Sequence, residues 1–321
     1  MKYLRVIRFT YILFALTNIT LAMLRAVETV FIAFVVSIST LILNCGINYL
    51  LINGHFGFPK LGVTGAAIGT LIARAMELIL VLTYVFVFDK KLGCRVTRIL
   101  KAKSALLIDY FKHCRFFIIV SLIFGIATAL QSVILGHMND SAIAANSVSN
   151  SLFQILKVAS VGASASAAVR IGKAVGEGDM AKIKAYSKTL QIIFLCIGAT
   201  TSTLLFFLRA PVLSLYTNLS PETYRMANQF LLVLCFTGFG TAYEMPTLCG
   251  IVRGGGDSRF VFLNDLISIF GIVLPFSYFA AFHWHFPPAA VVLCLNADQV
   301  FKCGAAFFKA NSYNWVKKLT R

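Results

Sequence analysis

The sequence predicts an all-α, polytopic membrane protein, a transmembrane bundle of about nine helices. Hydrophobic residues make up 59% of the 321 residues and charged residues only 13%, about half the share of a soluble domain. The mean hydropathy is +0.83. Apolar runs of about 20 residues recur along the whole chain, and each is long enough to cross a bilayer as a helix. These runs do not alternate as the strands of a membrane β-barrel would.

The nine apolar runs fall into two groups. We expect spanning helices at about residues 3–24, 29–53, 62–88, 113–136, 142–170, 186–208, 224–251, 260–282 and 287–310. The longest connection separates the first three from the last six. The predicted domains are therefore a partial N-terminal bundle of three helices (1–90), a basic cytoplasmic linker (91–112), a C-terminal six-helix bundle (113–310) and a basic cytoplasmic tail (311–321).

The formal net charge of +17 comes largely from lysines and arginines in short connections between apolar runs. Such placement is typical of the positive-inside rule and not of a nucleic-acid-binding surface, so no nucleic-acid partner is expected. The basic connections and the C-terminus are then cytoplasmic, in a multi-pass protein of the plasma membrane. Nine spans would place Met1 outside, although Lys2, Arg5 and Arg8 are crowded there. This conflict predicts that further helices belong upstream.

A weak internal repeat relates the first helices to the last ones. Tyr3–Thr10 aligns with Phe230–Thr237 at an offset of 227 residues, with identical residues at four positions. The first three helices then pair with the last three, and the middle three have no counterpart. We therefore expect parts of two pseudo-symmetric bundles, three helices plus six, where a complete pair would have six plus six.

No motif in the chain supports an enzyme or a metal site. The eight cysteines include no CxxC pair and lie mostly within apolar runs, which is typical of small buried residues. Gly254–Asp257 matches the GxGD pattern of intramembrane aspartyl proteases, but the preceding helix offers no second aspartate. His283 and His285 have no third ligand near them in the sequence. We expect no catalytic residue, no metal and no cofactor other than a coupling ion.

Glu244 and Asp265 are carboxylates inside apolar helices, where an isolated charge is costly and indicates a functional site. Glu244 precedes Pro246 and lies nine residues before Arg253, about 13 Å from the basic end of its helix. A proline interrupts the backbone hydrogen bonding, which often opens a polar site. A carboxyl group at this depth can hold a proton and release it to a competing cation. We predict that both acids bind a cation or substrate; the alternative is an ion pair with another helix.

Two other helical acids have a cation on the same helix face. Arg74 and Glu77 are three residues apart, and Asp298 and Lys302 are four apart, so the members of each pair can meet. We interpret both as structural ion pairs that lower the cost of placing charge in a membrane. The alternative role for Asp298 is that of a relay.

The helix expected from Ala142 carries one polar stripe. Its members follow one another at spacings of four, four and three residues: Asn146, Asn150, Gln154 and Lys157. In a membrane such a stripe faces protein or water and not lipid. It either lines a translocation path, with Lys157 neutralising an acid while the site is empty, or joins helices through hydrogen bonds. Tyr243 either stacks on a cationic ligand or packs in a helix interface.

Five longer stretches carry a family resemblance: NYLLINGHFGFPKLGVTGAAIGTLIAR (48–74), AIAANSVSNSLFQIL (142–156), VRIGKAVGEGDMAKIKAYSK (169–188), LSPETYRMANQFL (219–231) and GIVRGGGDSRF (250–260). Together they resemble the multidrug and toxic compound extrusion (MATE) family. The resemblance implies twelve helices in two six-helix bundles, of which this chain begins at the fourth. It also implies a monomeric antiporter in the lipid bilayer that exports organic, often cationic, compounds or drugs in exchange for Na⁺ or H⁺.

One departure from the family pattern keeps alternatives open. Many relatives carry a glutamate early in the helix that corresponds to 113–136, whereas Ile118–Gly125 contains no acid and Ser121 lies at about its place. The first alternative is an N-terminally truncated fragment that does not transport. The second is a lipid-linked saccharide flippase of the wider superfamily, which the acids within apolar helices disfavour.

Overall fold

The computed structural model describes residues 2–27, 29, 31–57, 59–89, 104–216 and 219–317, and these ranges contain helices and turns but no strand. Within them, nine segments are long and apolar enough to cross a membrane as helices. They run over Leu4–Ala26, Phe31–Asn53, Val63–Phe88, Ile118–Gly136, Asp140–Glu177, Met180–Ser214, Pro221–Val252, Ser258–Phe282 and Pro288–Ser312. The nine segments coincide with the nine predicted spans, so the all-α membrane fold is confirmed.

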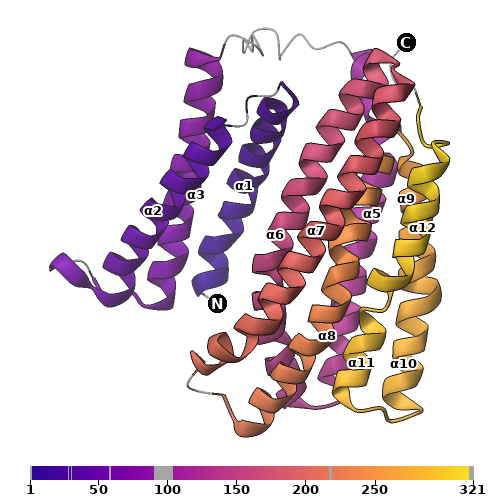
Figure 1. Cartoon of the computed structure of the whole chain (residues 1–321). Coiled ribbons are helices and arrows are strands. Elements are labelled where there is room, and N and C mark those ends of the chain that lie inside the picture. The colour runs from indigo at the N-terminus through magenta and orange to yellow at the C-terminus, as the bar shows by residue number, and fades with distance from the viewer. Residues whose placement is uncertain are drawn as a thin grey trace. The chain divides into compact units, whose positions relative to one another are not determined.

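The chain divides into two compact units, Met1–Leu107 and Ile108–Arg321. Unit 1 contains α1 (Lys2–Ala26), α2 (Phe31–Asn53), a short turn η1 (His55–Gly57), α3 (Val63–Thr83) and a wider π-type turn η2 (Tyr84–Phe88), as Figure 1 shows. α3 packs against both α1 and α2, which hardly touch each other. Small residues on α3 allow this close packing, since a Cβ atom on Gly65 would lie 2.6 Å from the Leu51 carbonyl oxygen.

Unit 2 holds the remaining spans, and wide turns or breaks interrupt the last three of them. Its elements are α5 (Ser104–Gly136), α6 (Asp140–Glu177), α7 (Met180–Ser214), α8 (Pro221–Pro246), η3 (Thr247–Val252), α9 (Ser258–Leu266), η4 (Ile267–Val273), α10 (Leu274–Phe282), α11 (Pro288–Leu295) and α12 (Asp298–Ser312). η3 and η4 are π-type turns that continue α8 and α9 without ending the span. Each π-type turn changes the regular helical hydrogen bonding close to an acid, Glu244 before η3 and Asp265 before η4.

Several helices extend beyond the predicted spans. α5 begins at Ser104, so the part of the predicted linker (91–112) from there onward is helical and not a loop; residues 91–103 lie outside the described part of the chain. Within α5, Ile118–Gly136 is one of the nine segments that are long and apolar enough to cross a membrane. Hydropathy indicates where a helix lies in the membrane, whereas backbone hydrogen bonds continue into the water beyond it. α6 continues past residue 170 to Glu177, and α7 begins before residue 186, at Met180, and continues past residue 208 to Ser214.

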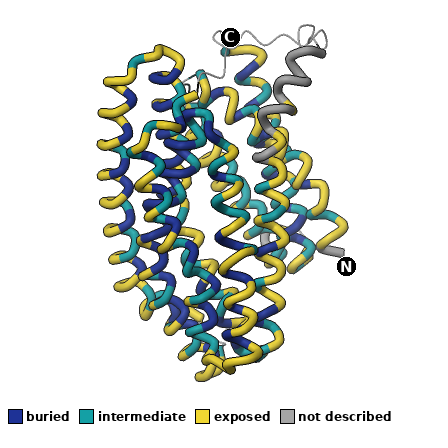
Figure 2. Tube along the Cα trace, turned by 90° about the vertical axis from the view of Figure 1, so that its right-hand side faces the viewer, coloured by how far each residue is buried: buried dark blue, intermediate teal, exposed yellow. Residues whose placement is uncertain are grey.

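α8 lies at the centre of unit 2. It packs against α6, α7, α11 and α12. In the most apolar part of its span 67% of the residues are buried, against at most 33% in any other span within the described ranges. Buried residues form the interior of this bundle and exposed residues its outside, as Figure 2 shows. A polar side chain on the inner faces of α8 is therefore surrounded by protein and not by lipid.

A C-terminal strap, Tyr313–Lys317, closes one end of unit 2. α12 stops where Tyr313 takes a left-handed conformation (φ 56°). The strap then lies over the turn Gly254–Asp257: the Lys317 amide donates to the Gly255 carbonyl oxygen at 2.9 Å, and Trp315 is fully buried. A Cβ atom at Gly255 would overlap the Trp315 ring. The strap therefore fixes the end of α12 to the turn between η3 and α9.

Candidate functional site

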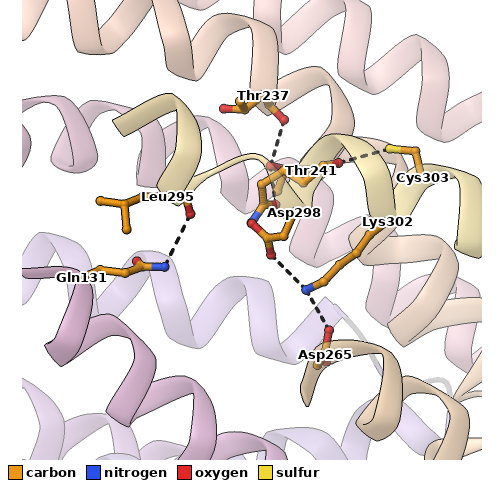
Figure 3. A network of polar contacts seen from close by, with 9 residues as sticks. Gln131, Thr237, Thr241, Asp265, Leu295, Asp298, Lys302 and Cys303 are labelled. Atoms are coloured by element: carbon orange, nitrogen blue, oxygen red, sulfur yellow. Dashed lines mark hydrogen bonds and ion pairs between the residues drawn. The ribbon is translucent and has the colours of Figure 1, made fainter. Parts of the chain in front are cut away.

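Lys302 on α12 lies between two carboxylates from different helices. Its Nζ atom is 3.0 Å from Asp265 Oδ1 on α9 and 2.9 Å from Asp298 Oδ2 on α12. The side chains of Lys302 and Asp298 are only 5% and 7% exposed, and that of Asp265 is 20% exposed. Figure 3 shows the ammonium group bridging the two acids. The Asp298–Lys302 pair expected from the sequence is present, and Asp265 joins it through the interhelical pairing that the sequence leaves open.

Hydrogen bonds connect these charges to α8. Thr241 Oγ1 donates to Gln299 Oε1 at 2.7 Å, and Gln299 Nε2 donates to Asp298 Oδ1 at 3.4 Å. We call Thr241, Asp265, Asp298, Gln299 and Lys302 the acid network. Sequence reasoning missed Thr241 and Gln299. Their signal was position, because Thr241 lies three residues before Glu244 and Gln299 directly follows Asp298.

A break in the last span positions Asp298. α11 ends at Leu295 and α12 begins at Asp298, with a turn at Asn296–Ala297 between them. Asp298 therefore lies in the first turn of α12, where backbone N–H groups favour a negative charge. On the other side of the break, Gln131 Nε2 of α5 approaches the Leu295 carbonyl oxygen at 3.5 Å. A membrane helix is interrupted only where its backbone lies against protein or a water-filled cavity, which indicates a polar interior at this point.

Glu244 lies on α8, and it adds a third carboxylate to the cluster. The residue is 8% exposed, and its side chain makes no hydrogen bond or ion pair with any residue in the described ranges. The charges that act on it are those of Lys302, Asp265 and Asp298, followed by Lys157. When all of these groups are ionised, the three carboxylates outnumber the Lys302 ammonium group. The cluster is thus acidic overall, and Glu244 is its unpaired member within the described structure.

The polar stripe is only partly directed to this cluster. Lys157 lines a small internal cavity together with Thr201, Ser202 and Thr241, so it reaches the edge of the acid network. Asn150 Nδ2 donates to Asn146 Oδ1 at 3.1 Å, which means that two members of the stripe bond to each other. Gln154 and Asn150 are exposed side chains on the outside of α6. Of the four residues, Lys157 is the one whose charge acts on Glu244.

Tyr243 points away from the acid network. Its hydroxyl group donates to Gln191 Oε1 on α7 at 2.8 Å, and the residue is 6% exposed. The packing of Tyr243 in a helix interface, which the sequence leaves open, is therefore its arrangement here. Tyr243 directly precedes Glu244 on α8, and its side chain points toward α7.

Unit 1 contains the second ion pair expected from the sequence. Arg74 Nη1 lies 2.6 Å from Glu77 Oε2, and Glu77 is 5% exposed. The pair borders a pocket of about 270 Å³ between α2 and α3, whose other lining residues are Ser37, Thr40, Leu41, Asn44, Thr70 and Ala73. Sequence reasoning missed this pocket, although hydroxyl and amide side chains recur on one face of α2 at Ser37, Thr40 and Asn44.

The charged residues of unit 2 are arranged for ion pairing and not as a preformed metal centre. No three His, Cys, Asp or Glu side chains in the described part of the chain are placed to hold a metal ion. Lys302 occupies the position between the Asp265 and Asp298 carboxylates that a small cation would need.

Comparison with known proteins assigns the chain to a family. Residues 116–279, about half of the chain, match the MatE family. The probable multidrug resistance protein NorM of Photorhabdus laumondii is 26% identical over 266 residues, 82% of this chain and 58% of that protein. The uncharacterized transporter YisQ of Bacillus subtilis is 24% identical over 289 residues, 88% of this chain and 62% of that protein. The chain therefore spans less than two thirds of the length of these relatives.

Solved structures share the fold. A MOP superfamily transporter from Pyrococcus furiosus superposes with a TM-score of 0.83 at 16% identity, over 97% of this chain and 68% of that chain. A mutant of the MATE transporter VcmN from Vibrio cholerae gives a TM-score of 0.74 at 16% identity, over 94% of this chain and 67% of that chain. At this identity the likeness shows the fold alone.

The nine membrane-length helical segments of the described ranges, with charged residues where helices are interrupted, define a multi-pass membrane protein. The chain belongs to the MatE family, whose members are transporters and not enzymes.

Proposed function

We propose that this protein works as a MATE-type antiporter that exports organic, often cationic, compounds in exchange for Na⁺ or H⁺. The observation that carries the proposal is the buried cluster of Glu244, Asp265 and Asp298 around Lys302. Asp265 and Asp298 share the Lys302 ammonium group inside membrane-spanning helices, and their charges act on Glu244, which has no ion pair within the described residues. The cluster therefore retains affinity for a further proton or cation. Relatives described as multidrug resistance proteins support the same class of cargo.

Lys302 acts in this proposal as a built-in competitor of the coupling ion. Its ammonium group neutralises Asp265 and Asp298 while no ion is bound. A Na⁺ ion between these carboxylates would release Lys302 toward Glu244, and a proton on either aspartate would weaken the ion pair. Both events loosen the link between α9 and α12. An organic cation would compete for the same negative charge, and such competition is what an exchange mechanism needs.

Lys157 connects the cluster to the polar stripe in this proposal. It lines a cavity with Thr241 and acts electrostatically on Glu244, so its charge offsets the acids before a cation arrives. Asn146, Asn150 and Gln154 continue the stripe along α6 and would line the path. Asp298 serves as a relay between Lys302 and Gln299, and the Arg74–Glu77 pair has a structural role in unit 1.

The remaining parts of the proposal concern placement. We infer a plasma membrane protein with its basic connections and C-terminus in the cytoplasm, because lysines and arginines concentrate in those connections. The transporter would act as a monomer, with no cofactor beyond the coupling ion. Its partners would be the lipid bilayer and small organic cations or drugs.

Ethidium accumulation in cells that lack their own exporters tests the function. Cells expressing the 321-residue chain should accumulate less ethidium than cells without it, and an ionophore that collapses the ion gradients should abolish the difference. Proteoliposomes given only a Na⁺ gradient or only a pH gradient would then identify the coupling ion. No efflux of ethidium or of a panel of organic cations, from chain verified in the membrane, would overturn the proposal for these 321 residues.

Replacing Glu244 with Gln should reduce gradient-driven efflux to background, because the unpaired carboxylate of the cluster is lost without a change in side-chain volume. Glu222→Gln is the matched control, since Glu222 lies in the first turn of α8 and bonds the Asn139 side chain at 3.2 Å. Both variants should reach wild-type abundance in the membrane. Efflux by Glu244→Gln at the wild-type rate would rule out this residue as the ion site.

A further inference from the structure

A groove of about 520 Å³ runs along the surface of unit 2 between α7, α8 and α12. Its walls are mainly apolar, and several of them are strongly exposed, with Ile192 at 62% and Phe307 at 52%. Leu195 and Phe239, which are also exposed, extend this apolar surface. A volume of this size is typical of sites that hold small organic molecules or part of a lipid. The apolar walls require an occupant with a hydrocarbon body.

The floor of the groove carries polar groups that are already paired. Gln191 Oε1 accepts hydrogen bonds from Tyr243 Oη at 2.8 Å and from Asn311 Nδ2 at 3.4 Å. Gln191 Nε2 donates to the Ser187 carbonyl oxygen at 3.2 Å. These groups satisfy one another, so the body of a ligand in the groove needs no polar atoms at this depth.

Two lysines on α7 stand at one end of the groove without an acidic partner. Lys188 lines the groove, and Lys184 lies one helical turn before it. In the part of the chain that the structure describes, neither forms an ion pair, and Lys184 Nζ lies 5.6 Å from the Tyr313 ring centroid. By contrast, Lys182 on the same helix is paired with Glu177 at 3.1 Å and with Asp179 at 3.5 Å.

Like charges four residues apart on a helix repel each other, and an anion between them removes that repulsion. Lys184 and Lys188 both lie within the first three turns of α7, which begins at Met180. The groove continues from Lys188 past Ile192 to Leu195, deeper along the same span. A cationic rim followed by an apolar channel matches a molecule with an anionic head and a hydrocarbon chain.

We propose that this groove binds an anionic phospholipid, with the phosphate at Lys184 and Lys188 and one acyl chain along the groove. A phospholipid of the surrounding bilayer fits because the groove opens on the outside of the bundle and its charged end lies near the end of a membrane span. The acyl chain would contact Tyr243 and Cys303, which adjoin Glu244 and Lys302. The bound acyl chain would therefore pack against α8 and α12, two of the helices that carry the acid network.

Alkylation of Cys303 tests the proposal, since this residue lines the groove. In the purified 321-residue chain with Cys303 as its single cysteine, held in detergent micelles that contain phosphatidylcholine, added phosphatidylglycerol should slow alkylation by N-ethylmaleimide roughly tenfold. Lys184→Gln/Lys188→Gln should remove this protection, whereas Lys182→Gln, on the same helix but paired with acids, should keep it. Leu195→Trp, which fills the groove and leaves both lysines in place, should protect Cys303 in the absence of any anionic lipid.

Native mass spectrometry of the same samples checks the stoichiometry. One phosphatidylglycerol adduct should dominate over phosphatidylcholine at equal concentrations, and the double lysine variant should lose this preference. Equal protection by the two lipids, or protection that survives in Lys184→Gln/Lys188→Gln, would overturn the proposal. Protection by ethidium but not by phosphatidylglycerol would also overturn it, because the groove would then belong to the exported compound.

Discussion

Lys302 holds a position that depends on its charge more than on its size. Two carboxylates lie within 3.0 Å of its Nζ atom, and both the lysine and Asp298 are almost completely buried. A buried ion pair adds little net stability because each ion loses its hydration, yet removal of one partner leaves an uncompensated charge. Removal of the Lys302 charge should therefore lower the stability of the fold by more than the ion pairs raise it.

Lys302→Met is expected to destabilise the protein by about 3–5 kcal/mol, because the buried Asp298 and the partly buried Asp265 would lose their cation. Thermal unfolding in detergent measures the loss. Lys309→Met is the matched control: its Nζ atom lies 2.9 Å from Asp257, which also has Lys317 at 2.8 Å, so this variant should lose about 1 kcal/mol at most. Adding Asp265→Asn and Asp298→Asn to Lys302→Met should restore most of the stability. A Lys302→Met protein as stable as its control would contradict this account.

Some of these residue contacts could be predicted and others could not. Asp298 and Lys302 share one helix face, so their spacing was sufficient to predict the pair. Asp265 lies 37 residues before Lys302, and only the packing of α9 against the end of the chain brings them together. Glu244 was singled out because a carboxylate in an apolar helix is costly, but its lack of a partner is a tertiary property. For Tyr243 the sequence left both ligand stacking and interface packing open, because it does not reveal helix rotation; the bond to Gln191 shows interface packing.

Helix α8 approaches α12 very closely at Gly240. A Cβ atom there would overlap the Gln299 carbonyl oxygen, which belongs to the acid network residue that bonds Thr241. Gly304 on α12 provides the opposite case, since a Cβ atom at that position would meet nothing within 4 Å. Alanine substitution at Gly240 therefore tests close packing between helices, and alanine substitution at Gly304 tests helix propensity alone.

Gly240→Ala should destabilise unit 2 by about 1–3 kcal/mol through overpacking between α8 and α12. Gly304→Ala should change stability by less than about 1 kcal/mol and in the favourable direction, because alanine is the better helix former. Melting temperatures of both variants in the same detergent provide the test. Equal effects of the two substitutions would mean that α8 and α12 can separate without cost.

Asp257 holds the C-terminal strap in place. Burial opposes its ionisation, but hydrogen bonds and charge from Lys317 and Lys309 outweigh burial and keep the pKa of this carboxyl below its usual range. A depressed pKa in the folded protein means that the stabilising contribution is complete above the usual value and is lost as the pH falls through the lower one. The strap should therefore stay docked at neutral pH and loosen only in acid, below about pH 4.

Asp257→Asn should release the strap at neutral pH, because Lys309 and Lys317 lose their shared anion. The chain contains two tryptophans, so in Trp284→Phe the fluorescence comes from Trp315 alone. Asp257→Asn in this background should shift the emission to longer wavelength and increase quenching by acrylamide. Glu177→Gln, which removes an exposed acid paired with Lys182, should leave both signals unchanged. Emission and quenching that match the parent would show that Trp315 packing alone holds the strap.

The molecule as a whole follows hydropathy closely and departs from it where tertiary packing decides. Nine apolar runs were sufficient to predict the nine segments of membrane-spanning length found in the described ranges. The break at Asn296–Ala297 could not be predicted, because no proline or glycine occurs there. The strap was expected to be a free basic tail, and its contacts with Gly255 depend on a meeting of segments 60 residues apart. Residues 318–321 of that tail lie outside the described structure.

The positive-inside pattern predicts which connections of unit 2 face the cytoplasm. In a cysteine-free background, Asp140→Cys at the start of α6 should react with a membrane-impermeant maleimide in intact cells. Glu177→Cys, at the other end of the same helix, should react only after the cells are opened. Both positions are exposed, so a difference in labelling would arise from the side of the membrane and not from burial within the protein. The reverse labelling pattern would invert the proposed orientation.

The break before Asp298 makes the last span two rods joined by a pivot at Asn296–Ala297. α12 has 15 residues, so its length is about 22 Å, and a tilt of about 5° at the pivot moves its far end by about 2 Å. Asp298 and Lys302 lie near the pivot, while the strap follows the far end of α12. A sub-ångström shift of the ion pairs near the pivot would thus become a larger displacement at Trp315, while α11 could stay in place. α11 would work as an anchor and α12 as a lever arm.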